Sequence, residues 1–108
     1  MVWRVQTLND AVDREFDALP ADMRARFARM CQLVASVGLD RMGAPHVRHV
    51  TGPLWEMRLA GRDGIARALY VAATGRRVVV VRVFVKKTRR TPRREIDVAL
   101  KRAREVLQ

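Results

Sequence analysis

The sequence predicts an α+β fold in which an antiparallel sheet packs on a helical hairpin. Three apolar, strand-like runs lie between residues 54 and 85, and glycine-containing connections separate them, as in an antiparallel meander. Two amphipathic helical stretches precede these runs and a third follows them. The predicted order is therefore strand, helix, helix, strand, strand, strand, helix, and a chain of 108 residues is long enough for one domain, spanning residues 1–108.

The first half of the chain is predicted to hold one strand and two helices. Residues 2–6 are short and apolar-rich, which indicates an edge strand. Asn9 or Asp10 is placed to cap the first helix, because their side-chain oxygens accept hydrogen bonds from the free N–H groups of a first turn. Pro20 separates this helix from the second, which Gly38 is expected to end. The two helices present one apolar face, and the sheet is the surface available to cover it.

The remaining connections follow from glycine and proline. Residues 39–53 contain two glycines and two prolines and are predicted to be a loop. Thr91 followed by Pro92 predicts the cap and the first position of the last helix. That helix carries one apolar stripe, made of Ile96, Ala99, Leu100, Ala103 and Leu107.

Each of the three strands carries an arginine among apolar residues: Arg58, Arg67 and Arg82. A charge in a strand interior is expensive to bury without a partner, so the three arginines predict an open, anion-facing side of the sheet. On such a side, Arg67 would contribute little to the core. Strict alternation places a set of five residues of the third strand on one face: Val78, Val80, Arg82, Phe84 and Lys86.

The positive charge is concentrated in the second half of the chain. The net charge is +11; residues 1–53 contribute +1 of it and residues 54–108 contribute +10. The electrostatic field of such an uneven charge distribution favours a polyanionic partner. Six of the nine residues from 86 to 94 are basic, namely Lys86, Lys87, Arg89, Arg90, Arg93 and Arg94.

The basic run has two interpretations. Arg93 and Arg94 lie in the first turn of the last helix, where cations oppose the helix dipole unless an anion lies between them and the backbone N–H groups. A solvated basic turn is the simpler interpretation. Continuity with the strand arginines favours phosphate binding by Arg82, Arg89, Arg90, Arg93 and Arg94.

Several classes of site are not indicated. The only serine, Ser36, lies at the end of a helix, and His46 and His49 lie in the predicted loop, so no nucleophilic triad is expected. The spacing of the two histidines resembles that of zinc ligands, but no further ligand accompanies them. Glycine-rich phosphate loops are missing too, and we expect neither a metal nor a cofactor.

The compartment is also indicated by the sequence. Cys31 is the single cysteine, which fits a reducing cytoplasm, and its position on an apolar helix stripe predicts a core residue. The longest aliphatic run is four residues, which is too short to span a membrane, and the first residues lack the layout of a signal peptide. We therefore expect a cytoplasmic protein without a membrane partner.

A histidine-poor, arginine-rich site suits one reaction in particular, the attack of an RNA 2′-OH on the adjacent phosphate. Negative charge develops on the phosphate oxygens, and preorganised arginines stabilise it without a metal. A lysine among other cations has a lowered pKa, which prepares it for proton transfer.

Short motifs between residues 54 and 99 resemble a known family. They are LWEMR at 54–58, GIARALY at 64–70, FVKKT at 84–88, and Thr91-Pro92 followed by Glu95-Ile96 and Ala99. Taken in this order, in a chain of this length and charge, they resemble the phage-derived HigB-like branch of the RelE toxin superfamily. The order of the predicted elements agrees with a RelE-like domain.

The resemblance implies a toxin of a type II toxin–antitoxin pair that cleaves mRNA on the ribosome without metal and leaves a cyclic phosphate. Arg58 and Arg67 match strand residues that face the scissile phosphate, and Lys86 and Lys87 match a basic pair at the end of the last strand. The implied partner is a helix-turn-helix antitoxin of the HigA kind, which neutralises the toxin and binds operator DNA.

The chain departs from the family pattern at its C-terminus, where many members carry a catalytic tyrosine or histidine. Nothing after Tyr70 is Tyr or His, so Tyr70, Lys86 and Lys87 are the candidates for proton transfer. Tyr70 alternates with Ala68 and therefore faces away from Arg67, which favours a core role for it. The departure leaves open an alternative function, a non-catalytic module that binds RNA phosphates.

Overall fold

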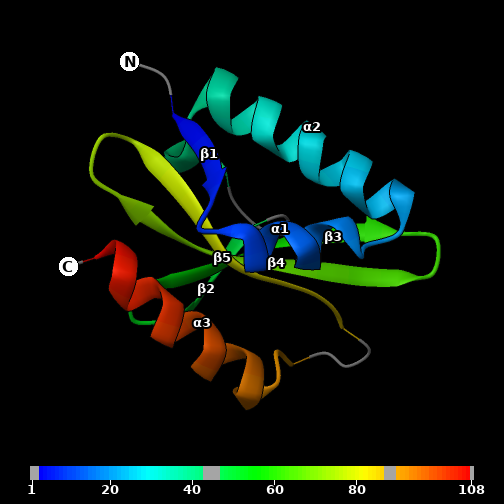
Figure 1. Cartoon of the computed structure of the whole chain (residues 1–108). Coiled ribbons are helices and arrows are strands. Elements are labelled where there is room, and N and C mark those ends of the chain that lie inside the picture. Colours follow the sequence, from blue (N-terminus) through cyan, green and yellow to red (C-terminus); the bar gives the residue numbers. More distant parts are fainter. Residues whose placement is uncertain (1–2, 43–46, 87–89, 108) are drawn as a thin grey trace.

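The computed structural model describes residues 3–42, 47–86 and 90–107 of the chain. Its strands form a five-stranded sheet of order β1-β5-β4-β3-β2, in which β1 runs parallel to β5 and the other neighbours are antiparallel. Figure 1 shows α1 and α2 on one side of this sheet and α3 on the other. The elements in chain order are β1 (Arg4–Thr7), α1 (Asp10–Asp17), α2 (Ala21–Val37), a 3-10 turn (Leu39–Arg41), β2 (Val47–Thr51), β3 (Leu54–Gly61), β4 (Gly64–Ala73), β5 (Arg77–Lys86) and α3 (Arg93–Val106).

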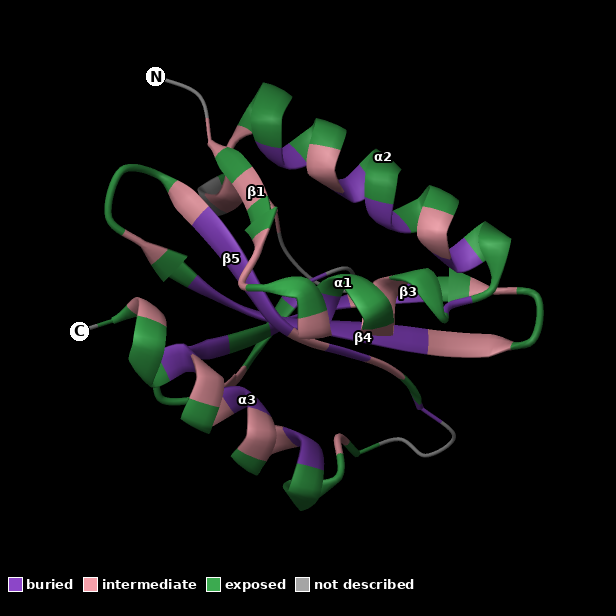
Figure 2. Ribbon diagram, in the orientation of Figure 1, coloured by how far each residue is buried: buried purple, intermediate pink, exposed green. Residues whose placement is uncertain are grey.

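The sheet separates two apolar cores, which is why both of its faces are covered (Figure 2). On the side of α1 and α2, the buried residues include Met23, Phe27, Tyr70 and Val80. On the side of α3, the core is smaller and contains Leu54, Leu69, Val71, Val79, Val81, Ala99 and Ala103. The predicted α+β fold, with the helical hairpin on the sheet, is therefore confirmed.

The helix ends follow local chemistry. Asn9 caps α1, and its side-chain oxygen accepts a hydrogen bond from the Val12 N–H at 3.2 Å, as predicted. Gly38 ends α2 with a φ of 89°, a conformation that favours glycine, and its N–H donates to the Val34 carbonyl. None of the described helices is long and apolar enough to cross a membrane.

One strand was missed, because residues 47–51 are not a loop. They form β2 at the edge of the sheet, where Val47 is paired with Met57 and Arg48 with Glu56. His49 therefore lies on a strand, while His46 is outside the described residues. The two-residue connection Gly52-Pro53 joins β2 to β3, with Gly52 at a φ of 52°. Only Val47 and Val50 gave this segment apolar character, so the strand pattern was weak.

The predicted alternation along β5 is wrong in its second half. The register shifts between Leu69 and Tyr70, which are paired with Arg82 and Val80, so that Val81 is an extra residue in a β-bulge. Val78 and Val80 consequently face α2, whereas Arg82 and Phe84 contact the side of α3. The bulge is what brings the end of β5 to the same face as Arg58 and Arg67.

The last helix also begins differently from the prediction. Pro92 occupies the N-cap position of α3, without a side-chain hydrogen bond to the first turn. The Thr91 hydroxyl donates instead to Glu56 Oε2 on β3, at 2.8 Å. The helix is therefore fastened to the sheet by Thr91 rather than capped by it.

Candidate nucleic-acid interface

The face of the sheet that packs on α3 changes character along its length. One end is apolar and buried, while the other end carries charged side chains from four neighbouring strands. We call these residues the basic cluster: Arg48 on β2, Arg58 on β3, Arg67 on β4 and Lys86 on β5. The structure thus brings together three of the predicted catalytic residues, and it adds Arg48, which the sequence did not indicate.

A buried carboxylate lies in the middle of the basic cluster. Glu56 is fully buried, and its Oε1 accepts from Arg67 Nη1 at 2.9 Å and from Arg48 Nε at 3.1 Å. Its Oε2 accepts the hydroxyl of Thr91. Glu56 thus connects β2, β4 and the residue that precedes the N-cap of α3.

The environment of Arg67 differs from the open face that was predicted. Arg67 is only 4% exposed and forms an ion pair with Glu56, so its charge is neither exposed nor solitary. Its Nε is buried and has no hydrogen-bond partner among the described residues. Burial lowers the pKa of the Arg67 guanidinium from its usual value, and the Glu56 carboxylate opposes this shift. Removing Arg67 would therefore disturb the interior, contrary to the expectation from sequence.

Arg58 and Arg67 are directly opposite each other on neighbouring antiparallel strands. Like charges in this position destabilise a sheet. Arg58 is partly exposed and forms no ion pair with another described residue. The pair is therefore an electrostatic cost in the isolated protein, and an anion bound between the two guanidinium groups would relieve it.

Lys86 lies at the end of β5 and is only 6% exposed. Burial lowers the pKa of its ammonium group, the Arg67 charge lowers it further, and Glu56 acts in the opposite direction. A lysine with a lowered pKa is better matched to proton transfer near neutral pH. The neighbouring candidates Lys87 and Arg89 lie outside the described residues.

Arg82 is occupied by carboxylates. Its Nε and Nη2 donate to the two oxygens of Glu95 on α3 at 3.0 and 3.1 Å, and its Nη1 lies 2.7 Å from Glu15 Oε2 on α1. Glu15 also accepts from Arg102 of α3 and from the Val83 N–H of β5. These contacts join both helical layers to the sheet, so the geometry gives Arg82 a structural role beside any contact with phosphate.

The other predicted phosphate-binding residues lie at the start of α3. Arg90 and Arg94 are exposed, and so is Arg93, whose Nε lies 3.0 Å from Asp97 Oδ1 one turn later. Arg93 and Arg94 do occupy the first turn of the helix, as predicted. Their positive charge lies at the end of α3 that the Thr91–Glu56 hydrogen bond fastens to the sheet.

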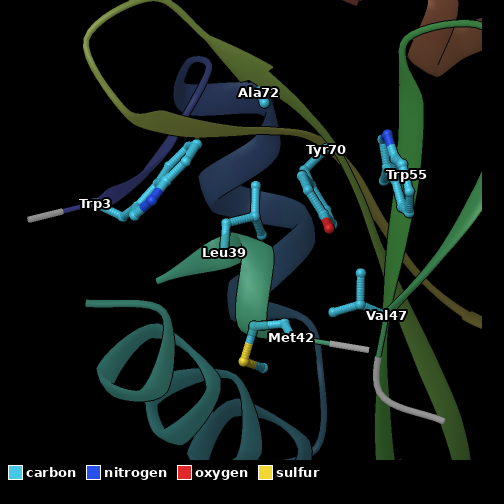
Figure 3. A pocket seen from close by; sticks show the side chains of 7 residues that line it. All are labelled: Trp3, Leu39, Met42, Val47, Trp55, Tyr70 and Ala72. Carbon is cyan, nitrogen blue, oxygen red and sulfur yellow. The ribbon is translucent and has the colours of Figure 1, made fainter. Parts of the chain in front are cut away.

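Tyr70 is on the opposite face of β4 from Arg67 and is 1% exposed in the core beneath α2, which confirms its predicted orientation. Figure 3 shows its hydroxyl pointing into a pocket of about 310 Å³ between Trp3, Trp55 and the end of the 3-10 turn. The same side of the sheet holds His49, whose ring packs edge-on against Trp55. Neither side chain belongs to the basic cluster.

Three residues of the site were not found from sequence: Arg48, Glu56 and Thr91. Glu56 was the available signal, because a carboxylate that alternates with Arg58 inside an apolar strand needs a cationic partner. Arg48 was hidden by the missed strand, and Thr91 by its apparent role as a cap. No group of three His, Cys, Asp or Glu side chains within residues 3–42, 47–86 and 90–107 is placed to hold a metal ion.

Comparison with known proteins supports this architecture. The family model "Phage derived protein Gp49-like" matches residues 14–104. The structure is similar to that of a mutant of the E. coli toxin RelE in the free state, with a TM-score of 0.67 and 16% identity over 94% of this chain and 98% of that chain.

A second similar structure is the archaeal RelE–RelB complex from Pyrococcus horikoshii OT3, with a TM-score of 0.55 and 20% identity over 81% of this chain and 98% of that chain. The search of curated proteins gave no match. The family model covers most of the chain, and both solved structures have the same fold. The chain therefore belongs to the family of phage-derived Gp49-like proteins and has the fold of the RelE toxins.

Proposed function

We propose that this protein is the toxin of a type II toxin–antitoxin pair and that it cleaves mRNA on the ribosome without a metal ion. The observation that carries the proposal is the facing pair Arg58 and Arg67, an unfavourable arrangement that a phosphate would relieve. The RelE fold and the membership of the Gp49-like family also support a toxin function. Growth arrest follows from the loss of mRNA.

The proposed reaction is the attack of a 2′-OH on its own 3′-phosphate. The 2′ oxygen forms a bond to phosphorus, the 5′ oxygen of the next nucleotide leaves, and a 2′,3′-cyclic phosphate results. The 2′-OH loses its proton to solvent water, the leaving oxygen gains one from a lysine, and solvent reprotonates that lysine, so the protons balance. Arg58 and Arg67 stabilise the charge on the phosphate oxygens, and Lys86 with Lys87 supplies the proton to the leaving group.

Arg58→Ala is the sharpest test of the site, since Arg58 is partly exposed and its loss leaves Glu56 with both of its arginines. Each variant is induced in a bacterial host without the antitoxin, and mRNA 5′ ends are mapped. Wild type should arrest growth with codon-phased cuts, and Arg58→Ala should cleave ~10²–10³-fold more slowly, as when one donor to a developing oxyanion is removed.

Arg29→Ala is the matched control, because Arg29 is an exposed arginine on α2 and its loss changes the net charge equally. It should remain as toxic as wild type. Intact mRNA under full expression of the wild-type protein would exclude the proposed activity. Equal toxicity of Arg58→Ala and Arg29→Ala would exclude this site.

The proposed partner is a helix-turn-helix antitoxin of the HigA kind, through which the complex binds operator DNA. The RelE–RelB complex supports an antitoxin partner for this fold. Co-expression with the protein encoded by the neighbouring reading frame should restore growth and give a complex that purifies together. If growth stays arrested although both proteins are present, that neighbour is not the antitoxin.

A non-catalytic RNA-binding module is the second candidate function. It is favoured by the position of Tyr70 and His49, which lie on the α2 side of the sheet and not in the basic cluster. This candidate predicts that RNA and ribosomes bind and that no cleavage product forms. Cleavage by purified protein on programmed ribosomes separates the two.

A further inference from the structure

We propose that Glu56 is a positioning residue, which holds Arg67, Arg48 and Thr91 in the arrangement that receives the scissile phosphate. The proposal rests on the proposed function, and it adds the residue that organises the site without touching RNA. Glu56 is 0% exposed, so neither of its oxygens can reach a 2′-OH or a phosphate on the surface. Its action on the reaction must pass through the groups that it holds.

The two oxygens of Glu56 have different partners. Oε1 accepts from both arginines, which come from strands on either side of β3. Oε2 accepts from Thr91, which stands next to the N-cap of α3. A single carboxylate therefore fixes two cations of the sheet and also the chain segment that leads from β5 to α3.

The orientation of Arg67 depends on this contact. Glu56 accepts a hydrogen bond from Nη1, while the buried Nε has no partner, so Glu56 is the one ion-pair partner of this guanidinium among the described residues. Repulsion from Arg58, directly opposite, would push Arg67 away if the carboxylate were neutral. Glu56 is thus the group that keeps two like charges close enough to hold one phosphate.

A merely structural role explains this residue poorly. Buried ion pairs are often replaced as a whole by apolar groups without loss of stability, so packing alone does not require a charge here, although loss of Glu56 alone leaves the buried Arg67 charge uncompensated. A carboxylate beside an anion site also weakens anion binding, because it repels the phosphate. A positioning role therefore predicts different effects on affinity and on rate. Neutralising Glu56 should leave RNA binding as tight or tighter, yet slow the chemical step.

The test compares Glu56→Gln with wild type on ribosomes programmed with a defined mRNA. Glu56→Gln keeps the shape and can still accept from Thr91, but it loses the charge that holds the arginines. The single-turnover cleavage rate should fall by ~10²-fold, the size expected when reacting groups are misplaced by about 1 Å. The ribosome concentration at half-maximal rate should stay equal or fall. Glu105→Gln, an exposed site on α3, should cleave like wild type.

Thr91→Val provides the second variant. It removes only the hydroxyl that donates to Oε2 and leaves both ion pairs of Glu56 in place. It should slow cleavage less than Glu56→Gln, and Thr91→Ser should recover the rate. An unchanged rate in Glu56→Gln would overturn the proposal, as would parallel losses of rate and affinity in both variants.

One readout does not depend on cleavage. In ¹⁵N NMR spectra, the buried Nε–H of Arg67 should give a separate, slowly exchanging signal in wild type. This signal should disappear in Glu56→Gln while the backbone spectrum stays folded. If wild-type protein does not cleave, the proposed function fails, and the Arg67 signal together with the affinity for a 2′-O-methyl oligoribonucleotide still decides the role of Glu56. An Arg67 signal that persists in Glu56→Gln overturns the proposal, and so does a loss of affinity for this oligoribonucleotide.

Discussion

Arg67 shows how strongly one residue of the site is tied to stability. Its ion pair with Glu56 is buried on both sides, and removal of one partner from a buried pair leaves the other charge uncompensated. The same guanidinium is also a proposed ligand of the scissile phosphate. Loss of toxicity in an Arg67 variant therefore has two causes that must be separated by measuring folding.

Arg67→Ala should lower the free energy of unfolding by ~3–5 kcal/mol, because the buried Glu56 carboxylate loses its buried ion-pair partner and keeps the half-exposed Arg48. Urea denaturation followed by circular dichroism measures this loss. Arg58→Ala, on the neighbouring strand, should be neutral or slightly stabilising, since it removes the facing like charge. Equal stabilities of the two variants would show that Glu56 does not depend on Arg67.

Lys86 should determine the alkaline limb of the pH–rate profile. Its ammonium is the proposed proton donor, so activity is present below its pKa and is lost as pH rises through it. Burial lowers this pKa, and the limb should therefore lie below 10.5. Lys86→Arg should cleave more slowly and move the limb to higher pH, because a guanidinium stays protonated. Single-turnover cleavage rates over a pH series measure the position of the limb. A limb that stays in place in Lys86→Arg excludes Lys86 as the proton donor.

Among the elements, β5 has the most unusual construction. It is paired with the short strand β1 only up to Val80, then bulges at Val81, and beyond that its outer edge has no strand neighbour among the described residues. The Glu15 side chain accepts the Val83 N–H at this edge and also pairs with Arg82 and Arg102. One carboxylate thereby closes the edge and joins α1 to α3.

Glu15→Ala should lower the free energy of unfolding by ~2–4 kcal/mol, since it leaves the N–H of buried Val83 unsatisfied and removes two ion pairs. Asp17→Ala, an exposed carboxylate at the end of the same helix, should change it by less than ~0.5 kcal/mol. Thermal and urea denaturation of both variants give the comparison. A Glu15 variant as stable as the Asp17 variant would mean that this network contributes nothing.

The elements also show what can be predicted from sequence. Helices with clear apolar stripes and caps, such as the one that begins after Asn9, follow from local chemistry. Strand β2 could not be recognised, because this five-residue edge strand has only two separated valines and therefore lacks an apolar run. The bulge at Val81 and the pairing of Glu56 with Arg67 depend on contacts between strands, which no local pattern reports.

At the scale of the whole molecule, the net charge of +11 favours the proposed RNA binding, and the number of phosphates contacted determines how this binding depends on salt. If the four cations of the basic cluster contact three or four phosphates, log K should fall with log salt at a slope of about −2 to −3, taking ~−0.7 per phosphate on single strands. Filter binding of a non-cleavable oligoribonucleotide measures the slope. Arg58→Ala should make it shallower by about 0.7, and Arg29→Ala should leave it unchanged.

The parallel pairing of β1 with β5 also has a consequence for how the protein folds during its own synthesis. Arg4 is paired with Arg77, so the first strand has no strand neighbour among the described residues until residues 77–80 have been made. Contacts so far apart in sequence form late and slowly. Lys86 is the last residue of β5 and Thr91 follows five residues later, which means that the sheet and the basic cluster are completed together. A nascent chain thus acquires its proposed phosphate-binding site only when its fold is almost finished.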